Sequence, residues 1–172
     1  MSDPDRQHQA SPLTAKRSWT DLGPRLASAV VLLALTIAGL YLGGYVFAAL
    51  VGAVFAGCYR EWERMITLKP LTPVGGVLIG MLVVSALVYP WLGPWASAGV
   101  VAAACLVAVA TDRSIAAWRV GGLLFVGIIL LAALAVRGAT GLGALAGVFL
   151  GVTVWLTDTG AFFTGRQIGG EK

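Results

Sequence analysis

The residues with the most chemical potential lie in the last stretch of the chain, from Trp155 to Lys172. Asp158 sits there in an otherwise apolar run. A carboxylate at membrane depth is costly and usually serves a function, so Asp158 is a candidate catalytic and metal-binding residue. Arg166 and Lys172 follow among glycines, where cations and backbone N–H groups can hold phosphates. A plain anchoring role for these two cations fits the same residues equally well.

Helical periodicity places Asp158 on a face of small residues. At 100° per residue, Gly143, Gly147, Gly151 and Asp158 fall within about 80° of one another. Threonines at 153, 157 and 164 flank this face, and bulky apolar residues occupy the opposite side. We therefore expect Asp158 to face protein or a water-filled cavity and not lipid.

The depth of Asp158 suits a site that is reached from the cytoplasm. It lies about six residues, or roughly 9 Å, from the end of its predicted helix. A metal or a phosphate group could be bound at that level. The structural alternative is an ion pair of Asp158 with Arg113 or Arg119, which would lock neighbouring helices together.

The composition that surrounds these residues is that of an integral membrane protein. The 172 residues are 58% hydrophobic and 12% charged, with a mean hydropathy of +0.86. Soluble domains contain about 25% charged residues. We interpret the net charge of +4 as a sign of basic cytoplasmic loops that contact anionic lipid headgroups, and not as a sign of nucleic-acid binding. The predicted fold class is an all-α, polytopic transmembrane helix bundle.

Other metal and nucleophile chemistries find little support. Cys58 and Cys105 lie in apolar segments without a ligand spacing, so we interpret them as small hydrophobic residues. The single histidine, His8, lies in a polar tail, which excludes a histidine-based metal site or a Ser-His-Asp triad within this chain.

Uncharged runs and their breaks predict about six spans. The first long run is too long for one span and breaks at Gly43-Gly44, although a single tilted helix is the alternative. The segment from Pro90 to Trp95 is predicted to be an aromatic turn. The expected spans cover about residues 26–42, 45–59, 74–89, 96–110, 115–136 and 142–164.

The basic residues orient these spans. On this topology Arg137 alone lies outside, and both termini are cytoplasmic. Residues 1–24 are predicted to be a disordered cytoplasmic tail and residues 25–172 a transmembrane domain. The eleven basic residues inside are Arg6, Lys16, Arg17, Arg25, Arg60, Arg64, Lys69, Arg113, Arg119, Arg166 and Lys172.

A short charged segment, Arg60-Glu61-Trp62-Glu63-Arg64, ends the second predicted span. The favoured interpretation is a solvated helix end, in which a glutamate pairs with a nearby arginine and Trp62 anchors the membrane interface. The alternative is a contribution to a cytoplasmic headgroup site.

Together these features resemble the phosphatidate cytidylyltransferase family, the CDP-diacylglycerol synthases. The most specific match is the segment Trp155-Leu-Thr-Asp-Thr-Gly-Ala-Phe-Phe-Thr-Gly-Arg166, which is similar to the family's Asp-x-x-Ala-aromatic-x-x-Gly-Arg pattern. Arg25 before the first span and the Arg60–Met65 segment match more loosely. The resemblance covers nearly the whole chain but only the N-terminal part of the family's usual length. We therefore expect a fragment that is inactive alone.

The resemblance implies a membrane-bound nucleotidyltransferase of phospholipid biosynthesis, which makes CDP-diacylglycerol from CTP and phosphatidic acid with Mg²⁺. It implies Asp158 as the catalytic and metal-binding carboxylate. It implies substrate contacts from Thr157, Thr159, Arg166 and Lys172. The expected location is the inner (plasma) membrane, multi-pass, with a cytoplasmic active face. A homodimer is left open.

Two other classes of function remain as alternatives. A small multi-span transporter or channel subunit would use Asp158 as an ion-coupling site. Transporters of this kind often contain paired broken helices in two related halves, and the sequence shows no such duplication. A purely structural membrane subunit would use Asp158 for assembly only.

Overall fold

The computed structural model describes residues 22–138 and 141–168. It contains five helices, α1 (Leu22–Leu42), α2 (Gly44–Thr67), α3 (Pro73–Thr111), α4 (Ala116–Gly138) and α5 (Gly143–Ile168). The described residues contain no strand, which agrees with the predicted all-α class. The chain divides into two units at Leu33, and the structure describes only the beginning of α1 in the first. The following paragraphs concern the second unit, from Ala34 onward.

The break between α1 and α2 is confirmed at the predicted glycine pair. Gly43 has a φ of 63° and Gly44 a φ of 49°, values that L side chains rarely adopt. The alternative of a single tilted helix is therefore wrong. The guanidinium of Arg137 contacts Gly43, and its Nε donates to the carbonyl oxygen of Leu40 at 2.6 Å. A cation at the carbonyl end of α1 is favourable there.

Helix α3 bends sharply at Gly93, whose φ is 79° and ψ −175°. Pro90 and Pro94 flank the bend, as the predicted turn requires. The hydroxyl of Ser85 donates to the carbonyl oxygen of Ser97 at 3.0 Å, and Ser97 returns the bond to Ser85. Twelve residues of straight helix would separate these serines by about 18 Å, so the two arms of α3 must fold back on each other.

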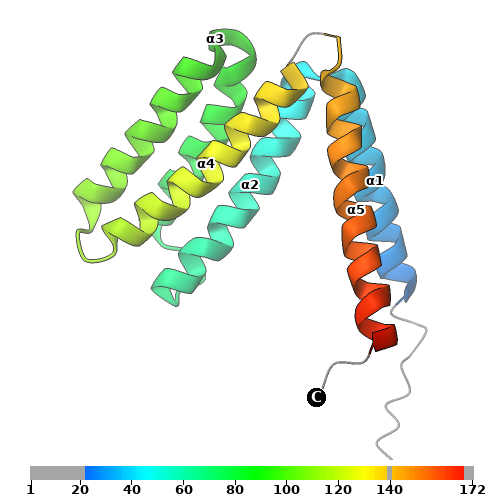
Figure 1. Ribbon diagram of the computed structural model, residues 1–172. Coiled ribbons are helices and arrows are strands. Elements are labelled where there is room, and N and C mark those ends of the chain that lie inside the picture. The colour runs from blue at the N-terminus through cyan, green and yellow to red at the C-terminus, as the bar shows by residue number, and fades with distance from the viewer. Residues whose placement is uncertain (1–21, 139–140, 169–172) are drawn as a thin grey trace, which may run out of the picture. The chain divides into compact units, whose positions relative to one another are not determined.

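Helices α2, α3 and α4 pack side by side (Figure 1). Their contacts include an apolar cluster, in which Tyr59 from α2, Leu78 and Leu82 from α3, and Leu123 from α4 are fully buried. A second cluster joins the same helices nearer the bend of α3. It contains Ala48, Ala86, Leu130 and Leu134.

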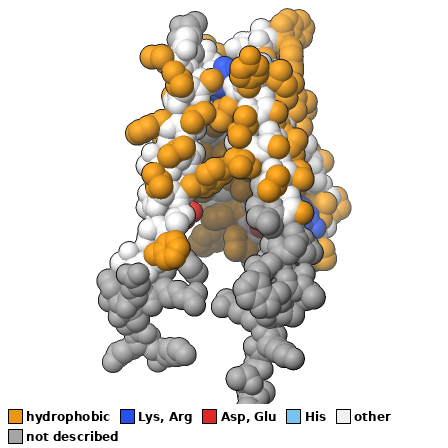
Figure 2. Space-filling model, turned by 90° about the vertical axis from the view of Figure 1, so that its right-hand side faces the viewer, with side chains coloured by type: hydrophobic (Ala, Val, Ile, Leu, Met, Phe, Trp, Pro, Cys, Tyr) orange, Lys and Arg blue, Asp and Glu red, His pale blue; other side chains and the backbone are white. Residues whose placement is uncertain are grey.

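Many large hydrophobic side chains are exposed, as they are in a protein that contacts lipid. Figure 2 shows them over most of the described surface on the side that carries α5. Three of the described helices are long and apolar enough to cross a membrane, namely α3, α4 and residues Gly143–Gly165 of α5. A shorter apolar helix covers Val30–Leu42. The structure fits a membrane protein, while the number of spans and the cytoplasmic placement of the termini stay predictions.

Candidate active site

Helix α5 carries most of the predicted site. Asp158 and the flanking Thr157 and Thr159 are exposed on it, and consecutive side chains lie about 100° apart around the axis. The hydroxyl of Thr157 donates to the carbonyl oxygen of Thr153 at 2.8 Å. The Thr157 hydroxyl proton is thus donated to a carbonyl oxygen of the same helix. To donate to a phosphate oxygen instead, the hydroxyl has to rotate away from that carbonyl. Arg166 lies on the last turns of α5, and Lys172 lies outside the described residues.

The glycine face of α5 is covered over its first part only. A side chain at Gly143 would meet the backbone of Arg137, and one at Gly147 would meet Leu40. Gly151 and Gly165 have no such neighbour within 4 Å in the described chain. Asp158 is exposed and no described residue covers it, so the expectation that it faces protein or a water-filled cavity stays a prediction. The glycine periodicity indicated a packing face correctly, but the packing stops before it reaches the carboxylate.

A second carboxylate, which the sequence analysis did not select, is fully buried between three helices. Glu63 of α2 accepts a hydrogen bond from Arg119 Nη2 of α4 at 2.7 Å, and Arg119 Nε lies 3.2 and 3.3 Å from its two oxygens. The hydroxyl of Thr72, at the start of α3, donates to Glu63 at 2.6 Å. We call Glu63, Thr72 and Arg119 the buried polar cluster.

The surroundings of Glu63 favour its charged form. Burial alone would raise the pKa of Glu63, but hydrogen bonds from Arg119 and Thr72 and the charge of Arg119 hold it below its usual value. Thr72 is also the N-cap of α3, where it accepts from the backbone N–H of Gly75 at 2.9 Å. Glu63 thus lies at the positive end of the α3 dipole, and this end favours an anion.

This cluster corrects two of the sequence interpretations. The segment from Arg60 to Arg64 is not simply a solvated helix end, because Glu63 is 0% exposed while Glu61 pairs at the surface with Arg60 at 3.3 Å. The alternative ion pair of Arg119 with Asp158 is also wrong, since the partner of Arg119 is Glu63.

A helical spacing could have identified the buried carboxylate. Ala48, Gly52, Tyr59 and Glu63 are all buried, and they recur at intervals of four and seven residues on one face of α2. The face was visible in the sequence as small and aromatic residues that lead to a glutamate. Its cationic partner was not, because Arg119 lies 56 residues away.

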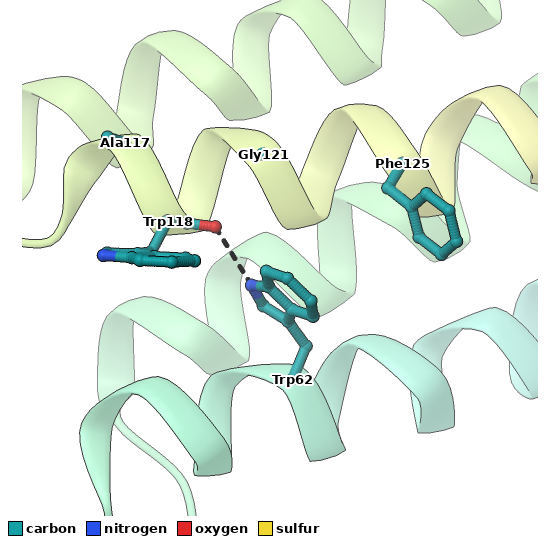
Figure 3. A pocket seen from close by; sticks show the side chains of 5 residues that line it. All are labelled: Trp62, Ala117, Trp118, Gly121 and Phe125. Carbon is teal, nitrogen blue, oxygen red and sulfur yellow. Dashed lines mark hydrogen bonds between the residues drawn. The ribbon is translucent and has the colours of Figure 1, made fainter.

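Trp62 takes part in the packing of α2 against α4. Its indole Nε1 donates to the carbonyl oxygen of Trp118 at 3.0 Å, and its ring lies against Gly122. Figure 3 shows Trp62, Trp118 and Phe125 around the small residues Ala117 and Gly121. Together they line an open apolar groove of about 590 Å³ between α2 and α4.

Comparison with known proteins places the chain in a family. The model of the cytidylyltransferase family matches residues 24–172. The chain belongs to this family. It is 28% identical over 157 residues to the phosphatidate cytidylyltransferases of Brucella suis biovar 1 and Brucella melitensis biotype 1. The match covers 89% of this chain but 57% of each relative, so the chain spans a little more than half the length of the curated relatives it matches. No solved structure matches it.

The Mg²⁺ ion that the resemblance implies would need several oxygen donors, and the described residues supply few. No three His, Cys, Asp or Glu side chains in residues 22–138 and 141–168 come together as a metal site. Glu63 is occupied by Arg119 and is enclosed. Asp158, the other carboxylate discussed, is exposed and offers a single ligand. The described part of this cytidylyltransferase-family chain therefore does not by itself fit a resident Mg²⁺ ion.

Proposed function

We propose that this chain is part of a membrane-bound nucleotidyltransferase that makes CDP-diacylglycerol from CTP and phosphatidic acid. The observation that carries the proposal is the family match over residues 24–172, which includes the Asp158 segment. Two further observations support it. The relatives are named phosphatidate cytidylyltransferase, and the long apolar helices fit an enzyme whose substrate is a lipid.

The reaction requires a phosphate oxygen of the lipid to attack the α-phosphorus of CTP. A new P–O bond forms, the bond from the α-phosphorus to the bridging oxygen breaks, and pyrophosphate leaves with the electron pair. Stabilising the charge that develops on the polyphosphate is the main catalytic task. This task needs cationic groups, and in our proposal Arg166 and Lys172 supply them.

Asp158 is the proposed catalytic carboxylate. It is exposed on α5, so a polar substrate group can approach it without displacing a protein partner. Mg²⁺ in such enzymes is commonly held by one or two carboxylates together with substrate phosphates. Asp158 could supply one of these ligands. Thr157 and Thr159 flank it as proposed substrate contacts.

The setting of the site is also part of the proposal. CTP is available in the cytoplasm, and the distribution of basic residues supports a cytoplasmic location for the end of α5, at an inner membrane. The transporter alternative loses its support, because the family match points to nucleotidyl transfer and the Asp158 segment is part of that match.

The test is CTP-dependent conversion of phosphatidic acid by membranes that contain the protein as encoded in its genome. Asp158→Asn is expected to lower the rate about 10²-fold or more, which is the usual cost of removing a group that stabilises the transition state. Glu61→Gln is the matched control, because Glu61 is also an exposed carboxylate, on another helix. An Asp158→Asn enzyme with the rate of the control would exclude the role proposed for Asp158. Ion flux in proteoliposomes without CDP-lipid formation would exclude the proposed reaction.

A further inference from the structure

Two buried polar atoms next to the Glu63–Arg119 pair have no hydrogen-bond partner among the described protein atoms. They are the hydroxyl oxygen of Tyr59 and Nη1 of Arg119. Tyr59 is 0% exposed and Arg119 3% exposed, so bulk solvent does not reach them. Buried polar groups are nearly always satisfied, by protein or by ordered water. Two unsatisfied groups in one cluster therefore point to a missing partner.

The two atoms belong to residues of one cluster of side chains. Tyr59 precedes Glu63 by four residues, so both side chains lie on one face of α2, one turn apart. Arg119 uses Nε and Nη2 on Glu63, which leaves Nη1 directed elsewhere. The hydroxyl of Tyr59 lies within electrostatic reach of both charged groups.

The chemistry of the cluster restricts what the partner can be. Glu63 and Arg119 neutralise each other, so the site does not call for an ion. Nη1 needs an acceptor, and the tyrosine hydroxyl can either donate or accept. Leu78 and Leu123, which share a core cluster with Tyr59, are fully buried. A small neutral molecule that both donates and accepts fits these requirements.

We propose that one water molecule is bound between the Tyr59 hydroxyl and Arg119 Nη1. It accepts from the guanidinium and bonds to the phenol, which gives it two of the two to four polar partners that buried waters have. It extends the buried polar cluster from Thr72 through Glu63 and Arg119 to Tyr59. Four residues from three helices are then joined in one enclosed network. The inference does not depend on the proposed enzymatic reaction.

The substitution Tyr59→Phe tests the proposal. The measurement is whether it lowers or raises the midpoint of thermal unfolding of the full chain in detergent. If a water binds the hydroxyl, removing it leaves the water and Nη1 poorly bonded, and the midpoint of thermal unfolding falls by several degrees. If the hydroxyl has no partner, its removal relieves a buried unsatisfied group, and the midpoint stays or rises. Tyr41→Phe is the matched control, because Tyr41 is 84% exposed and its substitution should leave the midpoint unchanged.

A structure at a resolution that shows ordered water separates a bound water from a direct bond between side chains. The expected result is one density peak within hydrogen-bond distance of both the Tyr59 hydroxyl and Arg119 Nη1. A direct bond between these two atoms, or a hydroxyl bonded to another protein group, would overturn the proposal even if Tyr59→Phe were destabilising. A midpoint for Tyr59→Phe at or above that of the unsubstituted protein would overturn it independently.

Discussion

Glu63 and Asp158 are both carboxylates on helices of a largely apolar chain, and their surroundings are opposite. Glu63 is fully buried, receives hydrogen bonds from Arg119 and Thr72, and joins α2, α3 and α4. Asp158 is exposed on α5 with no described partner for its charge. A buried charge persists only when it is paired, whereas a charge kept for chemistry must remain accessible. The contrast assigns Glu63 to the architecture and leaves Asp158 to the proposed reaction.

The largest effect expected from this contrast comes from breaking the buried pair. Arg119→Ala leaves Glu63 enclosed without its cation and should lower the free energy of unfolding by about 3–5 kcal/mol. Thermal unfolding in detergent would show a midpoint lower by about 6–20 °C, at roughly 2–4 °C per kcal/mol. Asp158→Ala should change stability by less than about 0.5 kcal/mol, because it removes no described contact.

A double substitution sharpens the same comparison. Glu63→Leu combined with Arg119→Met removes both charges, and buried ion pairs replaced by apolar residues of similar volume often cost little. The double variant should therefore recover most of the stability that Arg119→Ala loses. Equal unfolding midpoints for Arg119→Ala and Asp158→Ala would contradict the structure, in which Glu63 is fully buried and paired with Arg119.

A neighbouring glycine tests how closely α3 approaches Glu63. A Cβ at Gly75 would lie 2.6 Å from Glu63 Cγ, and one at Gly76 would meet nothing within 4 Å. Gly75→Ala should destabilise by about 1–3 kcal/mol through overpacking. Gly76→Ala, measured by the same thermal unfolding, is expected to be neutral or slightly stabilising, since alanine favours helix over glycine. Equal midpoints for the two variants would contradict the close approach.

The fold could largely be predicted from the sequence because its boundaries are local. Two glycines at 43 and 44 permit a backbone that other residues avoid, and the bend of α3 at Gly93 is flanked by two prolines. Each of these signals lies within a few residues of the break that it causes. The helices could therefore be delimited without knowledge of their neighbours.

The pairing within the buried polar cluster could not be predicted, because it is not local. Helical spacing distinguishes Glu63 from Glu61, since only Glu63 lies on the buried face of α2. The identity of its partner depends on the packing of α4, because Arg119 is 56 residues from Glu63. For Asp158 the sequence predicted a helix face that packs over its first part, at Gly143 and Gly147, while what faces the carboxylate stays a prediction. Helical periodicity says which residues share a face but not what meets it.

The smallest expected effect is a pH dependence that belongs to Glu63 and not to Glu61. Glu63 lies beyond the apolar stretch of α2, and hydrogen bonds from Arg119 and Thr72 hold its pKa in the folded protein below its usual value. The charged form thus contributes stability that is fully present above about pH 5. It is lost as the pH falls through the folded pKa, by at most about 1.4 kcal/mol per pH unit.

The stability difference between the unsubstituted protein and Glu63→Gln should be constant from pH 7 to 5 and shrink below that. Glu61→Gln, whose carboxylate forms only exposed pairs with Arg60 and Arg64 at 3.3 and 3.8 Å, should differ from the unsubstituted protein by less than about 1 kcal/mol throughout. Unfolding curves of the unsubstituted protein, Glu63→Gln and Glu61→Gln between pH 3 and 7 would measure these stability differences. Parallel pH profiles for the two glutamine variants would mean that burial does not distinguish the two carboxylates.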